Sequence, residues 1–133
     1  MSRGSCLCKG VKFEIHGELT RASHCHCSMC RKAHGAAFGS YGAVKADNFR
    51  VTSGAELITR YRSSPDVART FCARCGSRLQ FLRESKPEIL YVALGVFDDD
   101  PGVRPARHIF VGSKAPWFEI AEALPQHAGR PPA

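Results

Sequence analysis

Seven cysteines in three tight groups place the strongest constraint on what this 133-residue chain can fold into. An odd number of cysteines leaves one thiol over from a closed set of disulfides. Cysteines two or three positions apart suit a metal instead, because a tight turn of this kind directs two sulfurs at one centre. We therefore predict that the cysteines bind zinc. The groups are Cys6-Leu7-Cys8, Cys25-His26-Cys27-Ser28-Met29-Cys30 and Cys72-Ala73-Arg74-Cys75.

The seven ligands divide naturally into four and three. Structural zinc sites are usually closed by four protein ligands, whereas catalytic sites keep one position open. The two pairs can close a structural site that joins distant parts of the chain: Cys6, Cys8, Cys72 and Cys75. The central triple can hold a second, weaker zinc with a free position, and its members are the predicted catalytic residues: Cys25, Cys27 and Cys30.

Two other interpretations of these cysteines stay open. A C-x-x-C motif can be a thioredoxin-like redox pair, although that motif normally lies in a βαβ context, which is not evident in this sequence. The triple can also be a second structural site, completed by a neutral imidazole. Three histidines lie close enough in sequence to supply it: His24, His26 and His34.

The charge balance is basic but dispersed. The chain carries 19 Lys and Arg against 12 Asp and Glu, a net charge of +7. Such an excess raises the possibility of nucleic-acid binding, yet the basic residues are scattered singly or interleaved with apolar ones, so we expect specific nucleic-acid binding to be unlikely.

No apolar run approaches the length of a membrane span, and residues 1–10 show no apolar leader segment. We expect no membrane partner and a cytoplasmic location, where thiols stay free or bind metal.

The hydrophobic pattern predicts an all-β single domain of antiparallel sheets. Val11, Phe13 and Ile15 alternate with polar residues, as in a half-buried strand. A continuous apolar run at 89–94 suits a central strand. Short strands at regular spacing, separated by turn signals, indicate antiparallel sheets. Further strands are predicted at 38–44, 57–61, 67–71, 79–82 and 108–111, and short helices at 28–34, closed by Gly35, and at 117–123.

The domain is predicted to span residues 3–124. From Pro125 the chain reads Pro-Gln-His-Ala-Gly-Arg-Pro-Pro-Ala, without apolar periodicity. We expect residues 125–133 to form a flexible C-terminal tail.

The ordered motifs resemble the glutathione-dependent formaldehyde-activating enzyme family, which includes centromere protein V. The resemblance extends from Gly4 to about Trp117. It implies a tent-like, Mss4-type zinc-binding fold and the same division of the cysteines into a structural and a second zinc site. The motifs are Cys6-x-Cys8-Lys9-Gly10-Val11, Cys25-His26-Cys27-Ser28-x-Cys30-Arg31-Lys32, Phe71-Cys72-x-x-Cys75-Gly76, and the late His108-Ile109, Lys114 and Trp117.

The resemblance implies a zinc-dependent carbon–sulfur lyase. The family activity joins formaldehyde to glutathione as S-hydroxymethylglutathione, so a small thiol and an aldehyde are the expected partners. Arg31 and Lys32 are candidates for attracting anionic glutathione, and His108 and Trp117 for lining a pocket. The alternative is a non-catalytic, zinc-stabilised module that binds protein or nucleic acid, because a fold does not fix a function.

Overall fold

The computed structural model describes residues 1–132, and strands dominate it. The all-β prediction is therefore confirmed. One α-helix, α1 (Ser28–His34), lies within that range, together with four single-turn 3₁₀ segments at Ala46–Asn48, Ala55–Leu57, Leu94–Val96 and Val111–Ser113. The strands are β1 (Ser2–Ser5), β2 (Lys12–Ile15), β3 (Thr20–Cys25), β4 (Gly39–Lys45), β5 (Phe49–Ser53), β6 (Ile58–Ser64), β7 (Val67–Cys72), β8 (Arg78–Arg83), β9 (Ile89–Ala93) and β10 (His108–Ile109).

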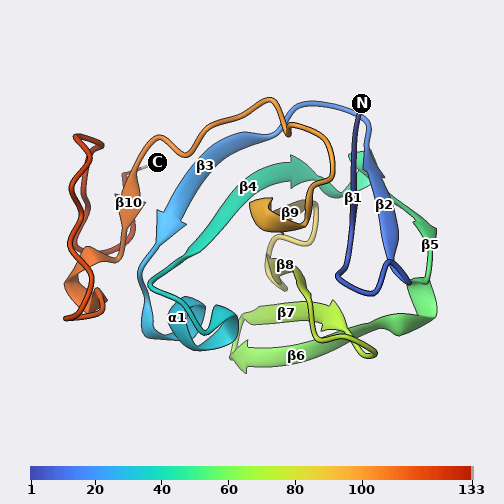
Figure 1. Ribbon diagram of the computed structural model, residues 1–133, viewed down its shortest axis with the longest axis horizontal. Coiled ribbons are helices and arrows are strands. Elements are labelled where there is room, and N and C mark those ends of the chain that lie inside the picture. The colour runs from blue at the N-terminus through green and yellow to red at the C-terminus, as the bar shows by residue number, and fades with distance from the viewer. Residues whose placement is uncertain (133) are drawn as a thin grey trace.

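The strands form two sheets that face each other (Figure 1). The smaller sheet has the order β1-β2-β5, and the larger one curves through the order β10-β3-β4-β9-β8-β7-β6. All pairings are antiparallel except that of β10 with β3, which is parallel. Strand β9 lies in the middle of the larger sheet, as its continuous apolar run predicts.

The main core fills the space between the sheets. Phe13 and Ile15 of β2 are buried and point inward, whereas Lys12 is exposed, which confirms the predicted alternation. The ring of Phe13 stacks on Phe49 with centroids 4.7 Å apart. Burying such side chains contributes roughly 1.5–3 kcal/mol each. The cluster is Phe13, Ile15, Leu19, Val44, Ala68, Leu82, Leu90 and Val92.

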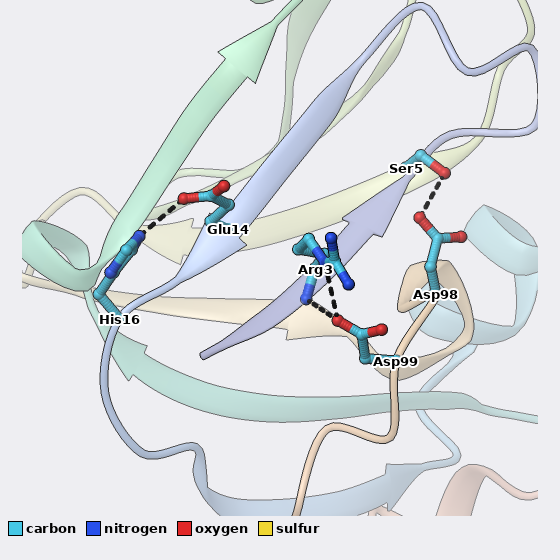
Figure 2. Close-up of polar contacts among 6 residues, drawn as sticks. All are labelled: Arg3, Ser5, Glu14, His16, Asp98 and Asp99. Carbon is cyan, nitrogen blue, oxygen red and sulfur yellow. Dashed lines mark hydrogen bonds and ion pairs between the residues drawn. The ribbon is translucent and has the colours of Figure 1, made fainter.

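Polar contacts attach β1 to the loop that follows β9 (Figure 2). The backbone N–H and the Nε–H of Arg3 both donate to Asp99 Oδ2, at 2.9 and 3.2 Å. Ser5 Oγ donates to Asp98 at 2.7 Å. These contacts hold the N-terminal strand, and with it the first pair of cysteines, in a fixed place.

The helix follows its sequence signals. Its N-cap is Cys27, whose sulfur accepts from the Cys30 N–H. It ends at Gly35, which has φ 60° and so adopts the left-handed conformation that glycine tolerates best. The predicted helix at 28–34 is confirmed at both ends.

One sequence prediction needs revision. Residues 117–123 form a turn and irregular chain rather than a helix, and the Phe118 carbonyl accepts a hydrogen bond from Lys114 Nζ instead of from a helical backbone N–H. The segment from Pro125 forms backbone hydrogen bonds with β10 and the following turn, such as His108 N to Pro125 O at 2.8 Å and Phe110 N to Gly129 O at 3.1 Å. The domain boundary at residue 124 and the flexible tail at 125–133 stay predictions.

No helix in the described residues is long and apolar enough to cross a membrane.

Candidate metal centres

The first cysteine cluster forms where two tight turns meet. One turn follows β1 and carries Cys6 and Cys8, and the other joins β7 to β8 and carries Cys72 and Cys75. The Cys6 and Cys8 sulfurs lie 3.5 Å apart, and those of Cys8 and Cys72 3.8 Å apart. All four sulfurs lie within 4.8 Å of one another. The structure thus brings together the four residues of the predicted structural site.

Each turn has the backbone of a zinc knuckle. Lys9 and Gly76, each directly after the second cysteine of its pair, have φ values of 62° and 80°. Gly76 takes this left-handed conformation without strain, whereas Lys9 does so at some cost. Backbone N–H groups turn inward as a result: Val11 N donates to the Cys6 sulfur at 3.2 Å.

The sulfur spacing fits zinc. Tetrahedral zinc with Zn–S bonds of about 2.3 Å sets its sulfurs about 3.8 Å apart, and the two measured spacings of 3.5 and 3.8 Å lie close to this value. The surrounding apolar side chains, Val11 and Leu79, are buried and exclude water from the inner side. A closed four-sulfur set suits a structural ion.

Hydrogen bonds favour ionised sulfur on one side of this cluster. The hydroxyl and the backbone of Ser77 lower the pKa of Cys75 to about 5. A backbone hydrogen bond from Gly10 favours the thiolate of Cys8, but burial and the neighbouring thiols outweigh it and raise the pKa of Cys8 to about 11. Ser77 Oγ also accepts from the Leu7 N–H at 2.8 Å, so it joins the two turns. Sequence reasoning missed this serine.

The second cluster is built from one short stretch of chain. Cys25 ends β3, Cys27 caps α1, and Cys30 lies in the first turn of the helix. Their three sulfurs lie within 4.8 Å of one another. Cys25 and Cys30 are buried, at 8% and 2% exposure, and Cys27 is partly exposed. Solvent and ligands therefore reach the cluster from the side of Cys27.

Negative charge is favoured at Cys27. Hydrogen bonds from Cys25 and then Cys30 lower the pKa of Cys27 far below the ordinary value of a thiol, while the shared protons raise the pKa of Cys25. The arrangement therefore favours the thiolate form at Cys27. Thiolate is the form that binds metal.

A buried arginine lies against this cluster. Arg69 of β7 is 8% exposed, and its Nη1 lies 3.6 Å from the Cys30 sulfur. Its Nε donates to Ser63 Oγ at 3.0 Å, and its guanidinium lies over the Phe81 ring. Burial lowers the pKa of Arg69, but the charge of Cys30, its hydrogen bond with Arg69, and the charges of Tyr41 and Cys27 together outweigh burial and raise this pKa. No local pattern in the sequence indicates that this arginine faces the cysteines.

The three nearby histidines do not join the sulfurs. No histidine nitrogen belongs to the second cluster anywhere in residues 1–132. His34 Nε2 and the Tyr41 hydroxyl are hydrogen bonded at 2.5 Å, His26 Nε2 meets His108 Nδ1 at 2.7 Å, and His24 Nδ1 meets Ser40 Oγ at 2.7 Å. The geometry therefore offers no support for a histidine as the fourth ligand of this cluster.

The other candidate residues have different surroundings. Arg31 Nε donates to the Ser113 carbonyl at 3.1 Å, so it ties α1 to the chain after β10. Lys32 is exposed. Trp117 is 69% exposed and lines no described pocket, whereas His108 is buried at 1%.

Two hollows on the described surface are relevant to the site. The larger, about 660 Å³, is lined by β5, β6 and β8 and lies away from the cysteines. The smaller, about 510 Å³, lies beside α1 and the second zinc knuckle, where His34 and Arg78 line it. His34 contacts Tyr41, which packs in the same buried cluster as Cys25 and Cys30. The smaller hollow is therefore the one next to the three-sulfur cluster.

Comparisons with known proteins agree with this geometry. Residues 1–113 match the family described as glutathione-dependent formaldehyde-activating enzyme. A protein of Halomonas elongata, provisionally named as such an enzyme, is 32% identical over 127 residues, which cover 88% of this chain and 79% of that protein. A crystal structure of a Rhodobacter sphaeroides protein superposes with a TM-score of 0.62 at 28% identity, covering 77% of this chain and 91% of that one.

Proposed function

Because the chain belongs to the glutathione-dependent formaldehyde-activating enzyme family, we propose that it is a zinc-dependent carbon–sulfur lyase that joins a small thiol to an aldehyde. Glutathione and formaldehyde are the proposed pair. The observation that carries this proposal is the second cluster, in which three sulfurs gather without a fourth protein donor among the described residues. An incomplete set of this kind leaves room for a ligand.

The residues of the two clusters take different roles in this proposal. Cys6, Cys8, Cys72 and Cys75 would hold a structural zinc, and Cys25, Cys27 and Cys30 a second one. When bound there, zinc would supply a positive centre that favours the thiolate form of an incoming thiol. We place the reaction in the cytoplasm, where glutathione is abundant and thiols stay reduced.

The protein's own side chains prepare this site electrostatically. Three thiolates and one Zn²⁺ leave one net negative charge, which would repel an anionic thiol. The guanidinium of Arg69, 3.6 Å from Cys30, offsets that charge inside the protein. Low polarity around the cluster strengthens this attraction. Arg69 is therefore a positioning and charge-balancing residue for the thiol.

Substrate access follows from exposure. Cys27 is the most accessible of the three cysteines, and the hollow beside α1 carries the positive charge of Arg78 on its wall. Glutathione carries two carboxylates and one ammonium group at neutral pH. We propose that the hollow accepts the glutathione peptide, with a carboxylate near Arg78, while its sulfur approaches from the side of Cys27.

Cys27→Ser provides the decisive test. Serine can still accept the Cys30 N–H at the helix N-cap, but it is a poor zinc ligand. We expect a cooperative thermal transition, lowered only by the loss of the weaker zinc, and a rate of hemithioacetal formation equal to the uncatalysed background. The background must be measured in parallel, because formaldehyde and thiols react without help.

Cys27→Ala is the matched control for the cap. It removes both the ligand and the cap, so its rate should equal that of Cys27→Ser while its stability falls by about 1 kcal/mol. A rate in either variant that matches the wild type would refute the proposed role of the cluster. The non-catalytic, zinc-stabilised binding module would then replace the enzyme as the proposed function.

A further inference from the structure

A third group of metal-ligand side chains lies on the opposite face of β3 from Cys25. Strand β10 pairs with β3 so that His108 stands beside His24, and β4 pairs on the other side so that Ser40 stands beside His24. Residues that stand opposite each other in a sheet project from the same face. The register therefore builds a row of His108, His24 and Ser40, and the two imidazole centroids are 4.9 Å apart.

A carboxylate covers this row. Glu122, in the irregular segment after β10, has its Oε1 at 2.5 Å from His108 Nε2 and 4.0 Å from His24 Nε2. One donor atom from each of the three side chains lies within 4.8 Å of the other two. Two imidazoles and a carboxylate are ligands that suit divalent transition metals such as zinc, iron and nickel.

Outer hydrogen bonds orient both imidazoles for such a role. His24 Nδ1 is bonded to Ser40 Oγ at 2.7 Å, and His108 Nδ1 to His26 Nε2 at 2.7 Å. In each ring the Nδ1 is thus engaged outside the group and the Nε2 faces Glu122. Metal-binding histidines are held in this way, because the hydrogen bond at one nitrogen fixes the ring and leaves the other for the ion.

We propose that His24, His108 and Glu122 form a binding site for a divalent transition-metal ion of the Zn²⁺ class, separate from both cysteine clusters. A tetrahedral ion with bonds of about 2.1 Å sets its donors about 3.4 Å apart. The spacings of 2.5 and 4.0 Å lie on either side of this value. Only Glu122 has to move to equalise them, and its side chain is 51% exposed and free to do so.

The surroundings leave one side of this site open. The ring centroid of Phe38 lies 4.4 Å from that of His24 and 5.5 Å from that of Phe118. The two phenylalanine rings form the apolar inner wall of the site. The opposite side, at Glu122, is open to solvent. The ion would have three protein ligands and water as the fourth. It would also hold the segment that carries Glu122 against β3 and β10.

Cobalt distinguishes this site from the cysteine clusters. The intact protein, supplied with only two equivalents of Zn²⁺ so that the tighter cysteine clusters are filled first, is titrated with Co²⁺ and followed by absorption. We expect one further equivalent with weak d–d bands and no sulfur-to-metal charge transfer, because its ligands are nitrogen and oxygen. Charge-transfer bands from the first addition onward would mean that Co²⁺ enters only the cysteine clusters, and would overturn the proposal.

Glu122→Gln and Glu119→Gln are a matched pair, since both remove one carboxylate from an exposed position of the same segment. Glu119 makes no hydrogen bond or ion pair among the described contacts. Dialysis against Zn²⁺ followed by elemental analysis should show about one zinc fewer in Glu122→Gln than in Glu119→Gln. Equal zinc contents would refute the site and leave His108–Glu122 as a simple hydrogen bond.

A variant outside the ligand set tests the orienting hydrogen bonds. Ser40→Ala removes the partner of His24 Nδ1 and leaves all three ligands in place. Loss of such a partner typically weakens metal binding about 10- to 100-fold, so the Co²⁺ ion at this site should bind at least about tenfold more weakly. An unchanged affinity would count against His24 as a ligand. None of these measurements depends on the lyase activity.

Discussion

Arg69 donates an N–H to the sulfur of Cys30 across 3.6 Å, in a place where both residues are buried. Arg69 forms no salt bridge with a carboxylate in residues 1–132. A buried charge without a partner would be very unfavourable. The cysteines of the second cluster are the negative partner that makes its burial possible.

Arg69→Met should therefore weaken metal binding at the second cluster. The change keeps an apolar side chain of similar length but removes the positive charge that balances the thiolates. We expect the affinity of the second zinc to fall about tenfold or more, as for other losses of an outer partner. Competition with a chromogenic chelator measures this affinity. Arg62→Met is the control, because Arg62 pairs with Glu84 on the surface and its loss should change nothing. Equal affinities in the two variants would contradict the counter-charge role.

Cys72→Ser should disrupt the fold rather than the chemistry. Cys72 is fully buried and belongs to the cluster that links the turn after β1 to the turn after β7. Structural zinc contributes about 10–16 kcal/mol in small domains, which is as much as the whole stability of a typical protein. We expect aggregation or loss of a cooperative thermal transition by circular dichroism. Cys27→Ser is the comparison, since it should stay soluble and keep a cooperative transition. A soluble Cys72→Ser protein with an unchanged transition would disprove the structural assignment.

Binding to DNA should be weak and salt-dependent. Several arginines that contribute to the charge of +7 are already engaged: Arg3 with Asp99, Arg62 with Glu84 and Arg104 with Asp100, while Arg69 is buried. The remaining charges can make a few phosphate contacts but offer no surface that reads bases. Fluorescence anisotropy of labelled duplexes should show binding at low salt that disappears at physiological salt. Tight, sequence-selective binding would instead identify a nucleic-acid-binding module.

The sequence predicted the features that depend on local spacing. The turns around the cysteines, the strand at β2 and the helix from Ser28 to Gly35 all follow from nearest neighbours along the chain. Strand β3, with the sequence Thr-Arg-Ala-Ser-His-Cys, has no apolar alternation and was missed. It is a strand because β4 and β10 pair with it on both sides. Pairing of this kind is decided by the whole sheet rather than by the segment itself.

Contacts between residues far apart in the sequence could not be predicted for the same reason. Arg69 lies 39 positions from Cys30, and His108 lies 82 positions from His26. A single sequence carries no pattern that indicates contacts over such separations. The three-sulfur cluster could be predicted because its members are neighbours, whereas its counter-charge could be found only in the folded protein.

Because Cys8 and Cys72 lie 64 positions apart in the sequence, the two cysteine clusters become complete at different times during synthesis. On the ribosome, at about 5–20 residues per second, Cys72 is made roughly 3 to 13 s after Cys8. The second cluster needs only one strand end and one helical turn, so it can capture an ion while the rest of the chain is still being made. The first cluster must wait until the two sheets have met. We expect metal uptake during refolding to occur in two phases, with the local cluster filled early and the distant one closing the finished fold.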